Sequence, residues 1–200
     1  MTDLLASTPA GIARAAELLS EGAVVAFPTD TVYGVGVATS HPERIDALFA
    51  LKRRPPEKQI PMLVADLDQA VAAGAVADDR SRALAAALWP GALTIVLPLA
   101  AGGSQAYRAP DHPVALALVR AAGPLYATSA NISGQPDTLG ADEVQIAFAT
   151  SREGLAAVVD GGPVPGGVAS TVIDCSLTPA VVLRPGPVSR DRLATIVEVA

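Results

Sequence analysis

The chain has few of the residues on which metal and redox chemistry depend. Its single cysteine, Cys175, excludes an intramolecular disulfide, and its two histidines, His41 and His112, lie too far apart to form a zinc-binding pattern. Neither histidine lies near Cys175, which leaves a cysteine nucleophile without an adjacent base. These absences predict that function rests neither on structural zinc nor on thiol chemistry.

Targeting and membrane signals are also lacking. Residues 1–9 have no basic region ahead of an apolar stretch, as a secretory signal would have. One long uncharged apolar run, residues 83–101, is interrupted by Pro90-Gly91 and again by Pro98, so it predicts a buried helix followed by a buried strand. We therefore expect a cytoplasmic protein with no membrane partner.

Basic residues are scarce: 14 Lys and Arg against 20 Asp and Glu give a net charge of -6 at pH 7, with a pI of about 4.8. Tight, unassisted binding of long nucleic acid requires many basic contacts to phosphates, so it is not expected. Yet both lysines and two arginines cluster at Lys52, Arg53, Arg54 and Lys58. A guanidinium can bind two phosphate oxygens and an ammonium adds a point charge, so Lys52 and Arg54 predict a polyphosphate clamp. A solvated charged turn is the alternative.

Composition and patterning predict a single α/β domain over residues 1–200. Half of the residues are hydrophobic, which in a chain of 200 is enough to bury one core. Short β-rich runs alternate with helical segments, which is typical of an α/β fold. These runs are residues 23–27, 93–97, 156–160, 171–175 and 180–184.

Three helices are predicted from their ends. One follows Ser40, with Glu43 completing a capping box, and ends near Lys52. A cation at that end suits the helix dipole, which gives Lys52 a purely structural alternative role. Residues 114–122 could form a buried strand or a buried helix, and the flanking Pro113 and Gly123 favour the helix. The third is expected to start after Ser189 and to continue to the end of the chain.

Two polar loops follow predicted strands. The first, residues 28–34, can place Thr29 against a ligand, with an ordinary turn as the alternative. The second offers Ser129 and Asn131 as uncharged ligands for phosphate and ribose oxygens, with a capped turn as the alternative. No Walker A motif occurs, and Gly34-Val35-Gly36 lacks the third glycine of a dinucleotide fingerprint.

Two arginines, Arg108 and Arg184, each end an apolar stretch shortly before a proline. One arginine suits a substrate carboxylate and the other a phosphate, although either can pair with a structural acid.

Seven motifs occur in order over nearly the whole chain: Pro28-Thr29-Asp30-Thr31-Val32-Tyr33-Gly34, Lys52-x-Arg54, Trp89-Pro90-Gly91-x-Leu93-Thr94, Arg108-x-Pro110, Ser129-x-Asn131-x-Ser133-Gly134, Ser170-Thr171-Val172 and Leu183-Arg184-Pro185-Gly186. Together they resemble the YrdC-like family of threonylcarbamoyl-AMP synthases, in its short, single-domain form. The resemblance implies a twisted mixed sheet flanked by helices, with a large, concave, electropositive cavity. It also implies a nucleotidyltransferase that joins L-threonine, bicarbonate and ATP into L-threonylcarbamoyl-AMP and pyrophosphate.

The resemblance further implies two sets of ligand-binding residues. The nucleotide set is Lys52, Arg54, Ser129 and Asn131, with Lys58, Ser104 and Arg184 as further candidates. The threonine set is Thr29, Arg108 and Thr171, with Arg108 as the partner of the threonine carboxylate. Mg²⁺ is expected to accompany ATP through ligands that the sequence does not identify, and no residue is assigned as a covalent nucleophile or base. Asp137 departs from the pattern, because many relatives carry a serine there.

The product implied by the resemblance is the activated precursor of threonylcarbamoyladenosine in tRNA. Because the chain is acidic, we expect a separate tRNA threonylcarbamoyl transferase to act on the tRNA, with no tight direct tRNA binding. Two other hypotheses stay open from the sequence. One is a noncatalytic RNA-binding or assembly module with the same fold. The other is carbamoyl-adenylate chemistry on a different acceptor, as in the YrdC-like domains of hydrogenase maturation proteins.

Overall fold

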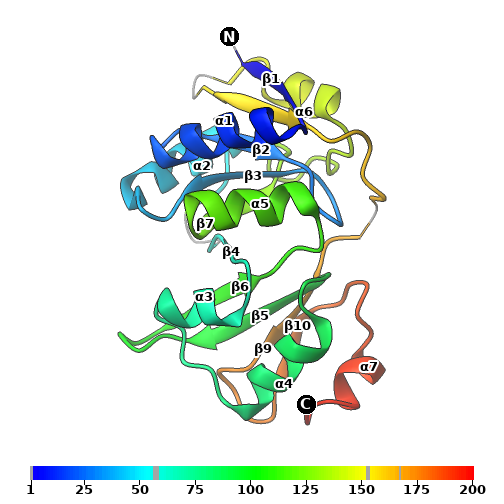
Figure 1. Ribbon diagram of the computed structural model, residues 1–200. Helices are drawn as coiled ribbons and strands as arrows, with labels where there is room; N and C mark the ends of the chain where they lie inside the picture. Colours follow the sequence, from blue (N-terminus) through cyan, green and yellow to red (C-terminus); the bar gives the residue numbers. More distant parts are fainter. Residues whose placement is uncertain (1, 56–58, 152–153, 167) are drawn as a thin grey trace.

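A mixed β-sheet of ten strands runs through the computed structural model, which describes residues 2–55, 59–151, 154–166 and 168–200 (Figure 1). The strand order is β1-β8-β2-β3-β7-β4-β6-β5-β9-β10. Four neighbouring pairs are parallel, β1 with β8, β2 with β8, β4 with β6 and β5 with β9, and the other pairs are antiparallel. The predicted α/β class is therefore confirmed, with a mixed sheet.

The strands are short, and most of them alternate with helices along the chain. The strands are β1 (Asp3–Ala6), β2 (Val25–Phe27), β3 (Gly34–Ala38), β4 (Met62–Leu63), β5 (Leu93–Pro98), β6 (Ser104–Arg108), β7 (Leu125–Ser129), β8 (Ala157–Asp160), β9 (Thr171–Asp174) and β10 (Val181–Arg184). The helices are α1 (Pro9–Ser20), α2 (Ile45–Lys52), α3 (Leu67–Ala72), α4 (Asp79–Leu88), α5 (Pro113–Ala122), α6 (Ala141–Phe148) and α7 (Arg190–Ala194), with a 3-10 turn, η1 (Pro42–Arg44).

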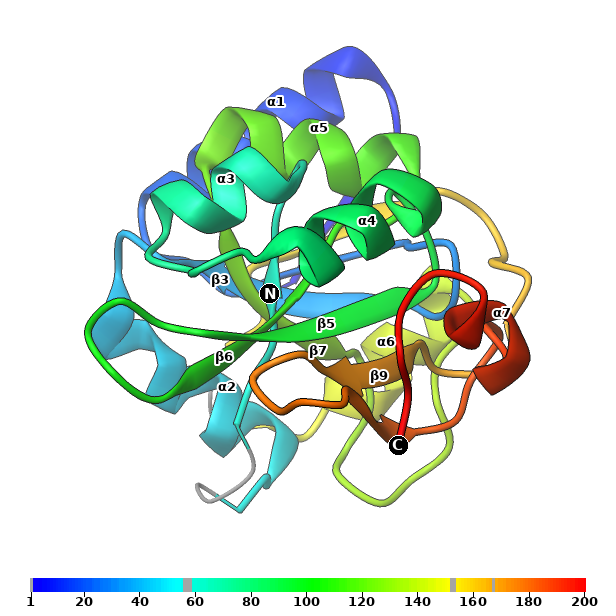
Figure 2. The same ribbon diagram turned by 90° about the horizontal axis from the view of Figure 1, so that it is seen from below.

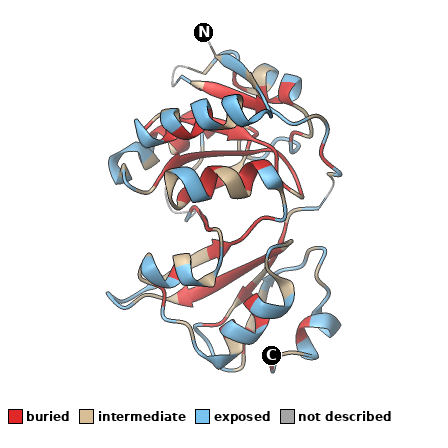
Figure 3. Ribbon diagram, in the orientation of Figure 1, coloured by how far each residue is buried: buried red, intermediate tan, exposed pale blue. Residues whose placement is uncertain are grey.

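Helices cover both faces of the half of the sheet that β1, β8, β2, β3 and β7 form (Figures 1 and 2). Along β2 the side chains alternate: Val25 and Phe27 pack with α1 and α5, whereas Ala26 packs with α2 and α6. This period of two is what a strand buried on both faces requires. A third core lies under α3, α4 and α7 in the other half of the sheet. Figure 3 shows the buried strands between helices whose outer faces are exposed.

The two halves of the sheet meet at β4, a strand of only two residues. Met62 and Leu63 pair with β7 on one side and with β6 on the other. The neighbouring strand β3 is buried along its whole length, and a Cβ added at Gly36 would lie 2.7 Å from the carbonyl oxygen of Tyr126. Glycine at position 36 therefore lets β3 and β7 approach closely.

Two predicted helices have different ends in the structure. The capping box after Ser40 is wrong: a 3-10 turn precedes α2, neither carries a side-chain cap, and Glu43 contacts His41. Lys52 is nevertheless the last residue of α2, as predicted. The last helix does start after the N-cap Ser189, but it ends at Ala194. It stops because residues 198–200 extend to bond with Ala180.

The other local predictions agree with the structure. The apolar run at 83–101 contains the end of α4 and the whole of β5, and residues 114–122 lie in α5. His112 is the N-cap of α5, with Pro113 at its first position. Among the described residues, no helix is long and apolar enough to cross a membrane.

Candidate functional site

A cavity of about 400 Å³ lies where the two halves of the sheet meet. The loop after β2 and strands β3 to β7, β9 and β10 all contribute to it. Among the described residues that line it are three arginines and no carboxylate, although the chain has a net charge of -6. The polar lining residues are Thr29, Thr31, Arg54, Gln59, Thr94, Arg108, Thr128, Ser129, Ser170 and Arg184. The fold therefore gathers cations and uncharged hydroxyls around one cavity, an arrangement that suits an anionic ligand.

Thr29 is at the cavity, but its hydroxyl shapes the loop after β2. Thr29 Oγ1 donates to Val32 O at 2.7 Å and accepts from the backbone nitrogens of Thr31 and Val32 at 3.2 and 3.3 Å. Such a hydroxyl-centred turn fixes a short loop without regular structure. The turn holds Thr31 where its hydroxyl accepts from Arg108 Nη1 at 3.0 Å.

Arg108, at the end of β6, is held by three different groups. Besides Thr31, its Nε donates to Gly91 O at 3.0 Å and its Nη2 donates to Asp30 Oδ1 at 2.6 Å. Burial lowers the pKa of Arg108, the adjacent Asp30 opposes that effect, and Arg184 adds to it. A guanidinium has five N–H donors, so three contacts leave one donor on each terminal nitrogen. Arg108 is thus oriented and still able to bind a carboxylate.

Lys52 is 1% exposed and lies behind the cavity wall. Its Nζ donates to Asn131 O at 2.6 Å and to Asn131 Oδ1 at 3.0 Å, and it also contacts Ser129 O. Ser129 Oγ donates to Asn131 Oδ1 at 2.7 Å, and Asn131 Nδ2 donates to Gln135 O at 2.6 Å. The structure therefore unites three members of the predicted nucleotide set in one hydrogen-bond network, and Ser129 carries this network to the cavity.

Burial is also the main influence on the Lys52 charge. It lowers the pKa of Lys52 to about 8, with Arg54 acting in the same direction and Asp137 against it. No carboxylate contacts Lys52 among the described residues. The cation is consequently held by neutral oxygens, and an anion placed nearby would stabilise it.

Arg54 and Arg184 line the cavity from segments far apart in the sequence. Arg54 Nη2 donates to Gln59 O at 2.9 Å. Arg184 Nε and Nη2 donate to Ser170 O at 3.0 and 2.8 Å, and the Ser170 hydroxyl lies 2.8 Å from Thr94 Oγ1. Burial lowers the pKa of both arginines. Each guanidinium is thus positioned by a carbonyl oxygen.

Besides Lys52 and Asn131, two of the predicted site residues do not line the cavity. Thr171 is fully buried, and its hydroxyl donates to Val188 O and accepts from Val188 N, so it has no side-chain contact to offer there. Ser104 begins β6, at the opposite end of that strand from Arg108, and does not line the cavity. Lys58 lies outside the described residues. Side-chain roles for Thr171 and Ser104 are therefore not supported by this arrangement.

Several residues at the cavity were missed by the motif argument. Thr31 and Thr94 lie inside motifs that the sequence did reveal, and Ser170 directly precedes Thr171. Side chains on a strand alternate between its two faces, so when Thr171 points inward, its neighbours face the cavity. This alternation could have indicated that Ser170 and Thr171 face opposite sides of β9. It does not indicate which of the two sides faces the cavity.

Other reactive groups of the chain lie elsewhere. Cys175 is buried, and burial raises the pKa of its thiol to about 11, which leaves it inert as a nucleophile. Among the described residues, no group of three or more His, Cys, Asp or Glu side chains could hold a metal ion.

The structure is that of an α/β protein with an open mixed sheet and a cation-lined cavity where two half-sheets meet. The Sua5/YciO/YrdC family model, described as telomere recombination, matches residues 17–186. The chain belongs to this family.

Relatives support the same membership. Threonylcarbamoyl-AMP synthase of Bacillus subtilis (strain 168) is 38% identical over 98% of this chain and 59% of its own length. The threonylcarbamoyl-AMP synthase of Serratia proteamaculans (strain 568) is 37% identical over 69% of this chain and 79% of its own length. The crystal structure of Pyrococcus abyssi Sua5 complexed with L-threonine is 31% identical, with a TM-score of 0.89, over 100% of this chain and 62% of that one. The chain thus spans about three-fifths of two of these relatives.

Proposed function

We propose that the chain is an L-threonylcarbamoyladenylate synthase, which makes threonylcarbamoyl-AMP and pyrophosphate from L-threonine, bicarbonate and ATP. Relatives named for this activity support the proposal, as does the binding of L-threonine by a relative of the same fold. The observation that carries it is the cavity, whose lining among the described residues has three arginines and no carboxylate in an acidic protein. Triphosphate and amino-acid carboxylate are the anions that the reaction brings there.

Different residues of the cavity are assigned to different ligands. Arg54 and Arg184, with the Lys52 network behind Ser129, would bind the phosphates of ATP. Arg108 would bind the threonine carboxylate through its two remaining N–H donors, while Asp30 and Thr31 keep it oriented. Because Arg108 is buried and already fixed, little conformational entropy is lost when the carboxylate arrives.

The reaction needs positioning more than a protein nucleophile. The threonine amine combines with bicarbonate, with loss of water, or with carbon dioxide, with loss of a proton from the amine, to give a carbamate. A carbamate oxygen then attacks the α-phosphate in line. The bond between the α- and β-phosphates breaks, and pyrophosphate leaves with its electron pair. Cations fixed beforehand around the phosphates stabilise the charge that develops on their oxygens. Arg54, Arg184 and Lys52 are assigned this role.

We also propose that Mg²⁺ enters with ATP. The cavity lining offers no carboxylate, and Asp30 is engaged by Arg108, so the described residues fit an ion held mainly by phosphates and water. Mg²⁺ commonly keeps several of its waters in nucleotide sites. When bound, it would shield the triphosphate charge, and the protein cations would supply the rest.

The product would serve threonylcarbamoyladenosine formation in tRNA through a separate threonylcarbamoyl transferase. The pI of about 4.8 supports this division, because tight tRNA binding draws on many basic contacts. A noncatalytic RNA-binding module would instead bind RNA tightly and lose that binding steeply as salt is added.

The test is pyrophosphate release measured with each substrate omitted in turn. Release that requires ATP, threonine and bicarbonate together supports the activity, and no release with all three present refutes it. Arg54→Ala should lower the rate well beyond threefold, since about threefold corresponds to only roughly 0.6 kcal/mol. The matched control is Arg53→Ala. Arg53 directly follows α2, is exposed and does not line the cavity. Equal rates for the two variants would contradict the clamp but not the activity.

A further inference from the structure

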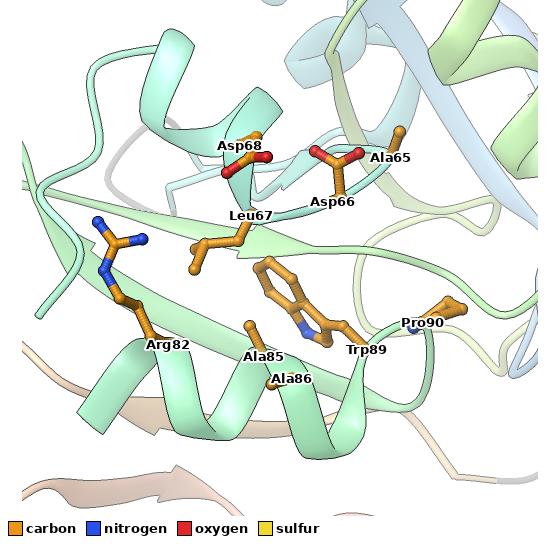
Figure 4. A pocket seen from close by; sticks show the side chains of 9 residues that line it. All are labelled: Ala65, Asp66, Leu67, Asp68, Arg82, Ala85, Ala86, Trp89 and Pro90. Carbon is orange, nitrogen blue, oxygen red and sulfur yellow. The ribbon is translucent and has the colours of Figure 1, made fainter. Parts of the chain in front are cut away.

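A second pocket, of about 310 Å³, opens between helices α3 and α4, and none of its residues lines the first cavity (Figure 4). It is lined by Ala65, Asp66, Leu67, Asp68, Arg82, Ala85, Ala86, Trp89 and Pro90. A volume of this size far exceeds the space of about 30 Å³ that one water occupies in the liquid. The proposed reaction uses none of these side chains, so the pocket needs a separate explanation.

Trp89 is the central wall of this pocket and is held rigidly. Its indole Nε1 donates to Leu93 O at 2.7 Å, and its backbone nitrogen donates to Ala85 O at 2.9 Å. The one polar atom of the ring is therefore already satisfied. What the indole presents to the pocket is its aromatic surface, and Figure 4 shows it beside Leu67 and above Ala85 and Ala86.

The rim of the pocket carries charges that are not paired with one another. Asp66 is the N-cap of α3 and accepts from Gln69 N through Oδ1 at 2.8 Å, which leaves Oδ2 open. Among the described residues, Asp68 and Arg82 form no side-chain hydrogen bond or ion pair. Figure 4 places the two carboxylates along one edge and Arg82 on the opposite helix. The edge next to the indole is thus negative.

We propose that this pocket binds an arginine side chain of a partner protein, stacked on Trp89 with its guanidinium toward Asp66 and Asp68. A guanidinium is attracted to the face of an indole and pairs with carboxylates in a planar, bidentate way. The aliphatic stem would contact Leu67 and Ala85, as long basic side chains do on apolar surfaces. Arg82 repels a cation from the opposite wall and so directs it to the aspartates.

The rim residues Asp66, Asp68, Arg82 and Pro90 are all exposed, so a chain carrying this arginine can lie across α3 and α4. The pocket is also adjacent to the turn that orients Arg108. Pro90 is followed by Gly91, whose carbonyl oxygen accepts from Arg108 Nε at 3.0 Å. A docked partner would therefore contact the turn whose carbonyl oxygen orients Arg108. The docking itself does not depend on the proposed reaction.

Trp89 makes this proposal directly measurable, because it is the single tryptophan of the chain. The full-length protein would be titrated with N-acetyl-arginine amide while the tryptophan fluorescence is followed. We expect a saturable change, with N-acetyl-citrulline amide, the neutral analogue of similar shape, binding at least about fivefold more weakly. No saturable change, or equal affinity for the two probes, would overturn the proposal.

Charge variants test the direction of the effect. Asp66→Asn with Asp68→Asn should weaken arginine-probe binding by about fivefold, and asparagine keeps the N-cap of α3. Arg82→Gln should strengthen it by about twofold. The control is Asp142→Asn, because Asp142 is the second residue of α6 as Asp68 is of α3, and it should leave binding unaltered. Unchanged binding in the double variant, or weaker binding in Arg82→Gln, would refute the electrostatic argument.

Free L-arginine distinguishes a docking site from a small-molecule site. The proposal expects it to bind no more tightly than the capped amide, because its own carboxylate would approach Asp66 and Asp68. Binding more than about tenfold tighter, a gain of roughly 1.4 kcal/mol, would instead identify a metabolite site and overturn the docking role.

Discussion

Lys52 should make ATP binding depend on pH in a range where few other groups of the chain titrate. The free protein holds this lysine 1% exposed among neutral oxygens, with its pKa lowered from 10.5 to about 8. Phosphates bound next to it would stabilise the cation and return the pKa toward its ordinary value. At pH 7 the lysine is charged with or without ATP, but at pH 9 the free protein must first take up a proton.

The expected size of the effect follows from that difference. The proton taken up per ATP bound rises from about 0.1 at pH 7 through one half at pH 8 to about 0.9 at pH 9. The dissociation constant should therefore rise about tenfold from pH 7 to pH 9, or roughly 1.4 kcal/mol. Isothermal titration calorimetry with Mg-ATP in buffers of different ionisation enthalpy would measure both the affinity and the proton uptake.

Lys52→Met supplies the control, since it keeps an unbranched side chain, one atom shorter than that of lysine, and removes the titrating group. This variant should bind ATP more weakly at pH 7 and show no pH dependence from 7 to 9. The same lysine also affects stability: its folded pKa is lowered, so the folded state binds fewer protons than the unfolded state between about pH 8 and 10.5. The unfolding free energy of the wild type should therefore rise with pH there relative to the variant. A flat wild-type affinity, or the same slope in Lys52→Met, would refute the argument.

Three further predictions concern the cavity and the sheet. Arg108→Ala should weaken threonine binding by about tenfold or more but ATP binding much less, because the lost contact is a charge-assisted pair with a carboxylate. Calorimetry with each ligand measures both affinities. Equal losses would contradict the division of roles. Asp137→Ser should tighten ATP binding by about two- to fivefold. Asp137 acts electrostatically on both Lys52 and Arg184, so its negative charge opposes the phosphates that these cations bind. Unchanged or weaker binding by calorimetry would contradict this effect. Gly36→Ala should lower the unfolding free energy by about 1–3 kcal/mol in urea denaturation, because its Cβ would lie 2.7 Å from a backbone oxygen. Gly154→Ala should change it by less than about 0.5 kcal/mol, because the added Cβ meets no atom within 4 Å among the described residues beyond its chain neighbours. Equal losses in both variants would refute the packing argument.

The sequence determined the class of fold and most of its elements, because these depend on local chemistry. Alternating apolar residues, Pro113 and Gly123 at the ends of α5, and the serine cap of α7 act within a few residues of where they stand. The start of α2 and the end of α7 were less predictable. Residues 198–200 leave the helical path to bond with Ala180, a contact that local sequence does not encode.

The tertiary structure decided which polar residues share a site. Position in the chain could indicate Lys52, Ser129 and Asn131 as candidates, but only the pairing of β3 with β7 and the packing of α2 bring them into one network. Thr171 turned inward and Ser170 toward the cavity because the two faces of β9 have different neighbours.

The same distinction explains why the sequence alone argued against a disulfide and a local zinc motif. A single cysteine cannot form an intramolecular disulfide, and the two histidines lack the short spacing of a zinc-binding motif. The small number of basic residues, by contrast, does not reveal which of them lie together in the folded protein. Only the meeting of the two half-sheets concentrates Arg54, Arg108 and Arg184 around one cavity, because charges far apart in the chain become neighbours only through long-range strand pairing.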